Sequence, residues 1–270
     1  MSKVLVIGSK GMLGRAVTLY FKRKGWLVSE LSRAEFDIAH TPIEQIIPYI
    51  KAADFIINCS GVIKPRINVT PIEDILKVNS VFPRNLALLS QIYKTPCIHI
   101  TTDCVYSGKK GGYTEEDFFD AEDVYGLSKC AGETKDCMTI RTSIVGEEEG
   151  QIRGLLEWAR SQKGKEGNGF TNHFWNGVTT VYLAEIFENI FSMGLYQQGI
   201  FHIFSPEAVS KYKLIEIINL VYQLDLKVKP VEAPERIDRT LSSIYDLSAK
   251  VCQKNIFEQV DLLKKFFGSS

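Results

Sequence analysis

The strongest constraint on the fold of this chain is a short apolar segment near its amino terminus that runs directly into a series of glycines. Residues 4–7 read Val-Leu-Val-Ile, a continuous apolar run that is typical of a strand buried on both faces. Glycines follow at positions 8, 11 and 14, and a helical pattern extends over residues 12–23. A strand, a glycine turn and a helix in this order predict the first unit of an α/β fold.

Each glycine of this turn has its own physical role in such a unit. Gly8 permits the tight turn, Gly11 lets the backbone approach a pyrophosphate, and Gly14 lets the helix pack closely against the sheet. The amino terminus of the helix then faces the anion, because its free N–H groups and its dipole favour negative charge. A purely structural glycine turn is the alternative, but the position between this strand and this helix favours a dinucleotide site.

Strand and helix patterns alternate along the chain, which predicts right-handed crossovers and a doubly wound parallel sheet. Apolar strand candidates lie at 3–7, 26–31, 53–58, 96–102, 138–145 and 200–204, and helical patterns lie at 12–23, 43–50, 72–93, 123–136, 151–162, 180–193 and 210–224.

Glycine-rich and polar residues at 146–154 and 163–177 predict loops that leave this sheet. We therefore expect a Rossmann-like domain over residues 1–146 and 178–204, and a smaller C-terminal lobe that binds substrate over residues 147–177 and 205–270. An apolar helical face near 257–267 is expected to close the core.

Composition excludes several classes of protein. A chain of 270 residues, 45% hydrophobic and with 32 basic and 32 acidic side chains, can bury one large core. It has no basic surplus for nucleic acid and no apolar stretch long enough to span a bilayer, and no signal peptide is expected. The 6 cysteines lack any metal-ligand spacing. We expect no metal, no nucleic-acid or membrane partner, and a reducing, cytoplasmic location.

Tyr125 and Lys129 lie 4 residues apart in a predicted helix and would therefore share one of its faces. A phenol normally loses its proton near about pH 10, and a neighbouring positive charge lowers that pKa. The pair is a candidate proton-transfer device for a carbonyl or an alcohol. A surface Tyr-Lys pair with no catalytic role is the alternative.

A second candidate group comes from the strand over 96–102, which ends in Thr101 and Thr102 shortly before Tyr125. Ligands of open parallel sheets bind beyond the carboxyl ends of the strands. Thr102 would thus present its hydroxyl where Tyr125 presents its own. A simple helix or turn cap is the alternative for this pair of threonines.

With these features the chain resembles the extended short-chain dehydrogenase/reductase family, and within it the dTDP-4-dehydrorhamnose reductase group. The likeness covers roughly the first 150 residues in the family's order, and the last third matches more loosely. The matching stretches are Gly8–Gly14, Ile56–Gly61, Val78–Ala87, Thr101–Gly108, Tyr113–Asp117, Val124–Glu133 and Ile140–Ser143.

The resemblance implies reduction of the 4-keto group of a nucleotide-linked 6-deoxy-4-keto sugar by NAD(P)H. Tyr125 donates a proton to the carbonyl oxygen, Thr102 stabilises that oxygen, and Lys129 binds the nicotinamide ribose and keeps the phenol acidic. The residues expected to bind the cofactor are Gly8, Lys10, Gly11, Met12, Leu13, Gly14, Ser32, Arg33, Asp37, Cys59, Ser60, Gly61, Asn79, Tyr125 and Lys129.

Cofactor preference can be inferred from the end of the second strand. An acidic residue there suits NAD, whereas an arginine suits the extra phosphate of NADP. Ser32 and Arg33 favour NADPH, with NADH as the second choice and a solvated cation as the other interpretation of Arg33. Asp37 matches a family position near the adenine, or caps a turn.

Cys104 bears on the type of reaction. Related dehydratases carry a glutamate here and need it to eliminate water, so the cysteine argues against a dehydratase. GDP-fucose synthase, an epimerase-reductase, has a cysteine at the matching place and a histidine further on. Cys104 and His173 are therefore candidates for a 3,5-epimerase activity, and a core filler and a structural histidine are their alternatives.

Other substrate candidates follow from position alone. Lys64, Arg66 and Arg239 are candidates for phosphates, and Trp175 and Asn176 are candidates for the sugar. Asp103 is a further candidate for binding the substrate. Each is equally explained as a loop or core residue. Ser143 replaces the tryptophan that rhamnose reductases often carry, which makes a UDP-linked 2-acetamido-4-keto sugar a rival substrate.

A function of another class also remains open. Some relatives of the reductases are regulatory subunits that bind a cofactor without turnover, with methionine adenosyltransferase as a partner in one example. The intact Thr102, Tyr125 and Lys129 argue against this hypothesis. A monomer or a homodimer is expected.

Overall fold

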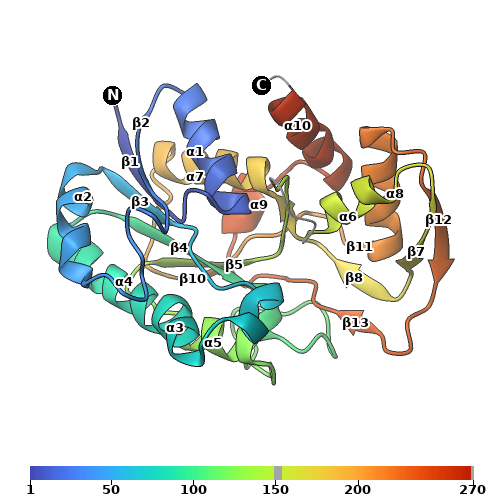
Figure 1. Cartoon of the computed structure of the whole chain (residues 1–270), viewed down its shortest axis with the longest axis horizontal. Coiled ribbons are helices and arrows are strands. Elements are labelled where there is room, and N and C mark those ends of the chain that lie inside the picture. Colours follow the sequence, from blue (N-terminus) through green and yellow to red (C-terminus); the bar gives the residue numbers. More distant parts are fainter. Residues whose placement is uncertain (149–153, 269–270) are drawn as a thin grey trace.

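The computed structural model describes residues 1–148 and 154–268. Its centre is a 6-stranded sheet in which every adjacent pair of strands is parallel (Figure 1). This confirms the predicted α/β fold with a doubly wound, Rossmann-like sheet. The strand order is β10 (Gly199–His202), β5 (Met138–Thr142), β4 (Cys97–Thr102), β3 (Phe55–Asn58), β1 (Lys3–Ile7) and β2 (Leu27–Leu31).

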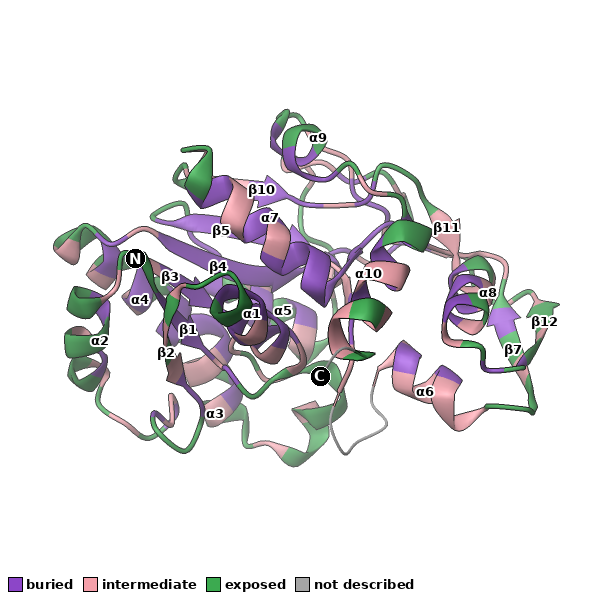
Figure 2. Ribbon diagram, turned by 90° about the horizontal axis from the view of Figure 1, so that it is seen from above, coloured by how far each residue is buried: buried purple, intermediate pink, exposed green. Residues whose placement is uncertain are grey.

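The apolar run of β1 is buried on both faces, as a central parallel strand must be. Val4 and Val6 belong to the core beneath α1 (Met12–Arg23) and α7 (Thr180–Ser192). Leu5 and Ile7 alternate with them and face the opposite core, beneath α2 (Ile47–Ala52) and α4 (Phe82–Tyr93). Helices therefore cover both faces of the sheet, and its inner strands β3, β4 and β5 are almost entirely buried (Figure 2).

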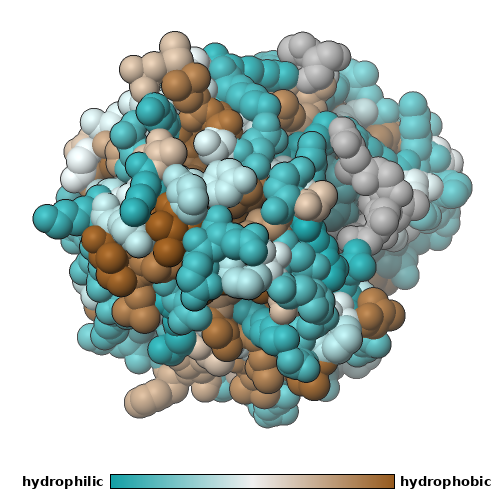
Figure 3. Space-filling model, turned by 60° about the vertical axis from the view of Figure 1, so that its left-hand side comes forward, coloured by the Kyte–Doolittle hydropathy of each residue, from teal (hydrophilic) through white to brown (hydrophobic). Residues whose placement is uncertain are grey.

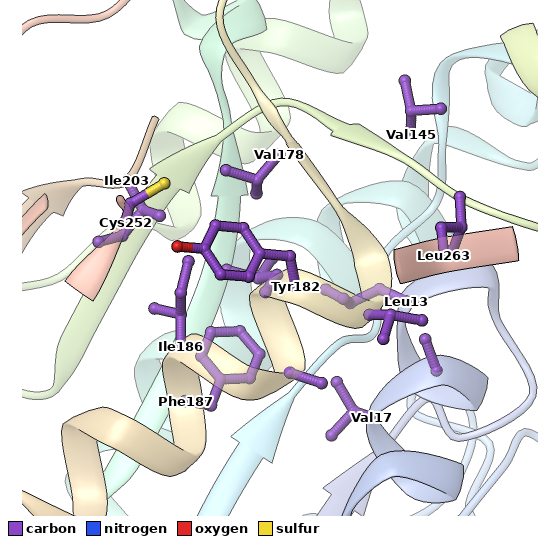
Figure 4. Packing of buried hydrophobic residues seen from close by; sticks show 14 of the residues in the cluster. Leu13, Val17, Val145, Val178, Tyr182, Ile186, Phe187, Ile203, Cys252 and Leu263 are labelled. Carbon is purple, nitrogen blue, oxygen red and sulfur yellow. The ribbon is translucent and has the colours of Figure 1, made fainter. Parts of the chain in front are cut away.

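The core on the α1 and α7 side continues into the carboxyl-terminal third of the chain. Tyr182 of α7 lies between Leu13 and Val17 of α1 on one side and Ile203 and Cys252 on the other (Figure 4). The last helix, α10 (Ile256–Gly268), packs against both α7 and α8 (Lys211–Tyr222). The apolar face near 257–267 thus closes the core, as expected.

The segments that we expected to form a smaller lobe lie beside the carboxyl ends of the central strands (Figure 1). Their first strands, β7 (Glu166–Phe170) and β8 (His173–Trp175), occupy a segment that the sequence predicted to be loop, so that prediction was wrong. The remaining elements are α6 (Leu155–Ser161), β11 (Val209–Ser210), α8, β12 (Lys227–Val231) and β13 (Ile237–Asp238).

Strand β7 escaped prediction because it has no apolar alternation and pairs with a distant segment. Its sequence is Glu-Gly-Asn-Gly-Phe, and it forms a parallel pair with β12. A Cβ at Gly169 would lie 2.7 Å from the Cα of Tyr212, so this glycine permits the close approach of α8. In β8, residues pair with β11 on one side and with β13 on the other.

Other predicted elements are present with different boundaries. The helix expected over 72–93 consists of α3 (Ile72–Leu76), a π-helical turn over Lys77–Val81 and α4. The strand expected over 138–145 breaks at Ser143 into β5 and β6 (Ile144–Val145), and β6 pairs with β9 (Val178–Thr179). The helix expected from residue 151 begins at Leu155 in α6, and residues 151–153 lie outside the described residues.

The remaining elements lie in connections. They are the 3₁₀ turns at Ile43–Ile46, Lys64–Val69 and Asp103–Val105, and the helices α5 (Val124–Gly132) and α9 (Leu247–Val251). The proposed division into two domains stays a prediction, and α10 packs across it.

The surface shows no single large apolar area on the face drawn in Figure 3, where apolar side chains form separate groups among hydrophilic ones. Exposed apolar residues of α3 and α4 include Ile72, Leu76, Leu88 and Ile92. None of the helices within residues 1–148 and 154–268 has the length and hydropathy needed to cross a bilayer.

A buried ion pair ties the sheet to α5. The Arg141 guanidinium on β5 lies 2.8 Å from the Glu133 carboxylate, and both side chains are only 2% exposed. Arg141 also donates to the Tyr106 hydroxyl at 2.7 Å. Because both charges have lost their water, each depends on the other for compensation.

We expect Glu133→Gln to lower the free energy of unfolding by about 3–5 kcal/mol, because it leaves the Arg141 charge buried and uncompensated. Chemical denaturation of the purified protein measures this. The matched control is Glu166→Gln in the exposed Lys229–Glu166 pair, where the side chains are 59% and 54% exposed. The control should cost less than about 1 kcal/mol, and equal losses in the two variants would contradict the assignment.

Candidate active site

A cleft of about 640 Å³ opens at the carboxyl ends of the central strands. The strand order changes direction at β1, which lies between β2 and β3, and ligands of doubly wound sheets bind at such a switch point. The cleft-lining residues come from the glycine turn, the ends of β3, β4 and β5, and α5. They include Lys10, Gly11, Met12, Leu13, Arg15, Cys59, Ser60, Gly61, Lys64, Arg66, Thr101, Thr102, Asp103, Cys104, Tyr125, Lys129, Thr142, Ser143, Glu147 and Glu148.

The glycine turn brings three stretches of backbone into direct contact. Gly8 has a φ of +77°, and a Cβ there would lie 2.9 Å from the backbone of Ser60. A Cβ at Gly14 would lie 2.1 Å from the carbonyl oxygen of Gly8. Neither position can accept a larger residue without displacing backbone.

Helix α1 begins at this turn with its amino terminus available to an anion. Gly11 is the N-cap residue, and among residues 1–148 and 154–268 no side chain hydrogen-bonds to this end of the helix. The first N–H groups of a helix have no partner within the helix, so they favour a negatively charged ligand. The lining residues Lys10 and Arg15 add positive charge around this end of the cleft. The turn therefore fits the diphosphate of a dinucleotide.

Two buried polar residues that the sequence analysis missed fix the position of Ser60, whose backbone packs against Gly8. Ser60 donates from its backbone N–H and its hydroxyl to the Asn58 side-chain oxygen, at 3.1 Å and 2.5 Å. The Asn58 amide nitrogen lies 3.1 Å from Nδ1 of His99. Both side chains are fully buried, so His99 orients Asn58 and Asn58 orients Ser60. Their signal in the sequence is a polar residue inside each apolar strand.

Thr102 and Tyr125 both line the cleft and lie close to each other. The Thr102 hydroxyl accepts from the backbone N–H of Cys104 at 3.1 Å and donates to the Asp103 carboxylate at 3.2 Å. It is therefore also the cap of the 3₁₀ turn. Burial raises the pKa of Tyr125, and the charge that Cys104 would carry raises it further, while a hydrogen bond with Thr102 opposes them. The phenol thus holds its proton at neutral pH.

Lys129 lies on the same helix, α5, but its ammonium is directed elsewhere. Nζ donates to the backbone carbonyl of Ile100 at 2.9 Å, and the side chain is buried. Burial lowers the pKa of Lys129 to about 8, and Glu133 and Cys59 partly oppose this shift. We expected Lys129 to make the phenol acidic; in this structure that expectation was wrong, because desolvation dominates at Tyr125.

The residues that we expected to set cofactor preference follow β2, close to the glycine turn. The backbone N–H of Gly8 donates to the Leu31 carbonyl at 2.8 Å. The Ser32 hydroxyl accepts from the backbone of Ala34, and Arg33 is exposed and forms an ion pair with Asp37 at 3.2 Å. Asp37 is thus the partner of Arg33 in this arrangement.

Several substrate candidates are occupied by other contacts. Lys64 lines the cleft but forms an ion pair with Asp123 at 2.6 Å. Asn79, predicted near the cofactor, is fully buried. Its side-chain oxygen accepts from the backbone N–H of Val62 at 2.7 Å, and its amide nitrogen donates to the Val62 carbonyl at 3.0 Å. It fixes the loop that carries Gly61 and does not line the cleft.

Three candidates from the smaller lobe do not line the cleft. His173 is half-buried, with Nε2 3.1 Å from the carbonyl of Glu235. Trp175 is buried, and the Asn176 amide is satisfied at both ends by the backbone of Leu241. Asn176 as a sugar ligand therefore stays a prediction, and in this structure its amide holds the backbone of Leu241.

Asp103 and Cys104 do line the cleft. Burial raises the pKa of the Asp103 carboxyl, while Arg239 and Lys211 oppose that shift. Burial also raises the pKa of the Cys104 thiol to about 12. Arg239 donates from Nε to the carbonyl of Tyr106 at 2.8 Å. In the described part of the chain, no cluster of His, Cys, Asp and Glu side chains could hold a metal ion.

A parallel sheet with a glycine turn at its switch point, and a Tyr-x-x-x-Lys helix beside a strand-end threonine, define a protein of the short-chain dehydrogenase/reductase type. The chain belongs to the family described as RmlD substrate binding domain, whose model matches residues 2–259.

Curated relatives of this chain have diverse names. "Spore coat polysaccharide biosynthesis protein SpsK" of Bacillus subtilis is 26% identical over 92% of this chain and 89% of its own length. A "dTDP-4-dehydrorhamnose reductase" of Mycolicibacterium smegmatis is 28% identical over 53% of this chain and 46% of its own length. "Methionine adenosyltransferase 2 subunit beta" of Danio rerio is 28% identical over 78% of this chain and 71% of its own length.

Among solved structures, the chain is similar to dTDP-4-dehydrorhamnose reductase from Bacillus anthracis in complex with NADP. The TM-score is 0.80 at 19% identity, and the likeness covers 100% of both chains. At this identity the comparison shows the fold.

The depressed pKa of Lys129 predicts a pH dependence of stability. The folded protein loses this proton near pH 8, whereas the ordinary lysine value is 10.5, so the unfolded chain holds more protons between these values. The free energy of unfolding contributed by Lys129 therefore rises with pH across this window. Relative to Lys129→Met, the wild type should gain about 2 kcal/mol between about pH 7 and about pH 9.5.

Chemical denaturation of both proteins at the two pH values gives the difference between their free energies of unfolding. Groups that titrate in the same way in both proteins cancel in this difference. Replacement of the exposed Lys109 by Met is the matched control and should show no such gain. A difference between wild type and Lys129→Met that stays constant with pH would contradict a depressed lysine.

Proposed function

We propose that this protein reduces the 4-keto group of a nucleotide-linked 6-deoxy-4-keto sugar with NAD(P)H. The observation that carries the proposal is that one cleft gathers the glycine turn, Thr102, Tyr125 and Lys129. The names of the M. smegmatis relative and of the B. anthracis structure support the substrate class, and the NADP in the latter supports the cofactor. The name of SpsK supports a place in polysaccharide biosynthesis.

The residues present fit a dinucleotide. The turn over Gly8–Gly14 leaves no room for a Cβ at its first and last positions, and the amino terminus of α1 is open to the diphosphate. Ser60 and Gly61 would hold the cofactor at the end of β3, and Lys129 would bind its nicotinamide ribose. When bound, the reduced nicotinamide supplies the hydride.

Side chains of this protein stabilise the negative charge that develops on the carbonyl oxygen of the substrate. Because burial keeps the Tyr125 phenol protonated, it can give its proton to that oxygen. Thr102 would stabilise the same oxygen by turning to it the hydroxyl proton that it donates to Asp103 in this structure. Lys129, with a pKa of about 8, keeps a positive charge beneath the site at neutral pH.

We expect Tyr125→Phe to lose about a hundredfold or more in turnover while it binds NADPH as the wild type does, because only the proton donor is removed. The assay follows NADPH oxidation with a panel of 4-keto sugars linked to dTDP, UDP or GDP. Tyr49→Phe, at a tyrosine that is 41% exposed, is the control and should be fully active. An active Tyr125→Phe enzyme would overturn the assignment.

Cofactor preference is a separate part of the proposal. The acidic residue that would suit NAD is replaced at the end of β2 by Ser32 and Arg33, and the exposed guanidinium can leave Asp37 for a phosphate. We therefore propose NADPH as the preferred cofactor.

Arg33→Leu should raise the KM for NADPH about tenfold, the typical effect of one lost charge-assisted contact. The KM for NADH should not change, because NADH lacks the phosphate that Arg33 would contact. Steady-state kinetics with both cofactors provide the internal control. Equal effects on NADPH and NADH would show that Arg33 acts on the fold of the turn.

Two other functions deserve the same assay. Cys104, which lines the cleft, supports a bifunctional epimerase-reductase as the second candidate, although the raised pKa of its thiol leaves little thiolate to act as a base at neutral pH. Solvent deuterium at C3 or C5 of the product would identify that activity. The name of the Danio rerio relative supports a third candidate, a non-catalytic regulatory subunit. In that case the protein would bind NADPH but would not oxidise it.

All 6 cysteines are free thiols, which supports a reducing, cytoplasmic compartment. The UDP-linked 2-acetamido-4-keto sugar stays a rival substrate, and the monomer or homodimer stays a proposal.

A further inference from the structure

The Asp37 carboxylate, which pairs with Arg33, has a second partner in His40. Oδ2 of Asp37 lies 3.2 Å from Nε of Arg33 and 3.2 Å from Nδ1 of His40. The other carboxylate oxygen, Oδ1, accepts from the backbone N–H of Ala39 at 3.1 Å. A guanidinium and an imidazole therefore share one oxygen atom, on the turn that follows β2.

The His40 ring also reaches α3. Its Nε2 lies 3.6 Å from Oδ1 of Asp74, so both ring nitrogens face carboxylates. The neighbouring Glu73 of α3 is itself paired with Lys77 at 2.6 Å. The His40 side chain is 59% exposed, so its ring can exchange protons with solvent.

A phosphate bound at Arg33 would change the charges around Asp37. Burial raises the pKa of Asp37, but hydrogen bonds from His40, Arg33 and the backbone of Ala39 lower it overall, so the carboxylate is ionised at neutral pH. When the guanidinium turns to a phosphate, Asp37 loses one of its two partners. The carboxylate then repels the phosphate, unless another cation stays beside it.

His40 can be that cation. An imidazole becomes positively charged when it takes up a second proton, which this type of side chain does between about pH 5 and about pH 8. Protonated His40 keeps Asp37 compensated after Arg33 has left, whereas neutral His40 offers a hydrogen bond without a charge. NAD has no phosphate on its adenosine ribose, so Arg33 stays on Asp37 and protonation of His40 brings no gain.

We infer that His40 determines cofactor specificity, because its protonated ring replaces Arg33 on Asp37 and so strengthens the binding of NADP but not that of NAD. The inference rests on the proposed function for the place of the cofactor phosphate at Arg33. His40 is a positioning residue, since it acts on the phosphate through Asp37 and Arg33. By linkage, NADP draws a proton onto His40, and the affinity for NADP rises as the pH falls.

Calorimetric titration with NADP and with NAD, at about pH 6 and about pH 8.5, tests the inference without turnover. His40→Gln keeps a neutral hydrogen-bond donor that cannot become charged. At the lower pH the wild type should bind NADP about threefold to fivefold more tightly than this variant, the effect of one exposed ion pair. At the higher pH the two proteins should bind NADP equally, and NAD should not distinguish them at either pH.

The cofactor phosphate also titrates in this range, and its contribution cancels because the two proteins are compared at the same pH. A proton count gives a second readout. Titrations at about pH 7 in buffers of different ionisation enthalpy measure the protons taken up with NADP. The wild type should take up more than His40→Gln does, a difference that a merely structural role of His40 would not produce.

Two further variants complete the comparison. His40→Lys carries a permanent charge and should bind NADP at about pH 8.5 more tightly than the wild type does. Lys77→Gln is the matched control, because it removes a neighbouring cation that pairs with Glu73 on α3. It should keep the pH dependence of the wild type.

The outcomes separate this inference from the proposed function. The inference is overturned if wild type and His40→Gln keep the same ratio of NADP affinities at both pH values, if NAD gains as much as NADP, or if Lys77→Gln loses the pH dependence as His40→Gln does. In each of these cases, a weaker binding of NADP to Arg33→Leu leaves the proposed cofactor preference standing. A gain for NADP alone that depends on His40 supports the inference even if no 4-keto sugar is reduced.

Discussion

The arrangement of this protein depends on backbone meeting backbone at the glycine turn. A side chain at Gly14 would overlap the Gly8 carbonyl, and one at Gly8 would overlap Ser60. Because Gly8 and Gly14 have no side chains, backbone atoms from the end of β1, the start of α1 and the end of β3 can come into van der Waals contact. That convergence brings the amino terminus of α1 and the end of β3 together in the lining of the cleft. The Asn58–His99 pair then fixes the Ser60 side of the same contact from within the sheet.

Desolvation shifts the pKa values of the two residues of the Tyr-x-x-x-Lys motif in opposite directions. Burial raises the pKa of the Tyr125 phenol and lowers that of the Lys129 ammonium, so both groups are moved toward their neutral forms. A proton donor that keeps its proton suits reduction better than one that has already lost it. Under the proposed function, the role of Lys129 is to bind and orient the cofactor, with a charge that is still present near neutral pH.

Much of the fold followed from local patterns, whereas the smaller lobe did not. Strands such as β1 are continuous apolar runs, and the Tyr125–Lys129 spacing fixes one helical face whatever the rest of the chain does. Strand β7 is glycine-rich and gains its hydrogen bonds only from β12, so no local signal exists. For the site, the sequence identified which strand ends meet. It could not show that the amide of Asn176 hydrogen-bonds to the backbone of Leu241, because Leu241 lies far along the chain.

The π-helical turn at Lys77–Val81 has a consequence for how this chain can vary over evolutionary time. It carries Asn79 to the loop before the cleft and Ser80 to α5, where Ser80 donates to the Ser128 carbonyl. Loss of one residue there would rotate α4 by about 100° relative to α3 and separate both contacts at once. These two contacts therefore constrain the number of residues in this helix.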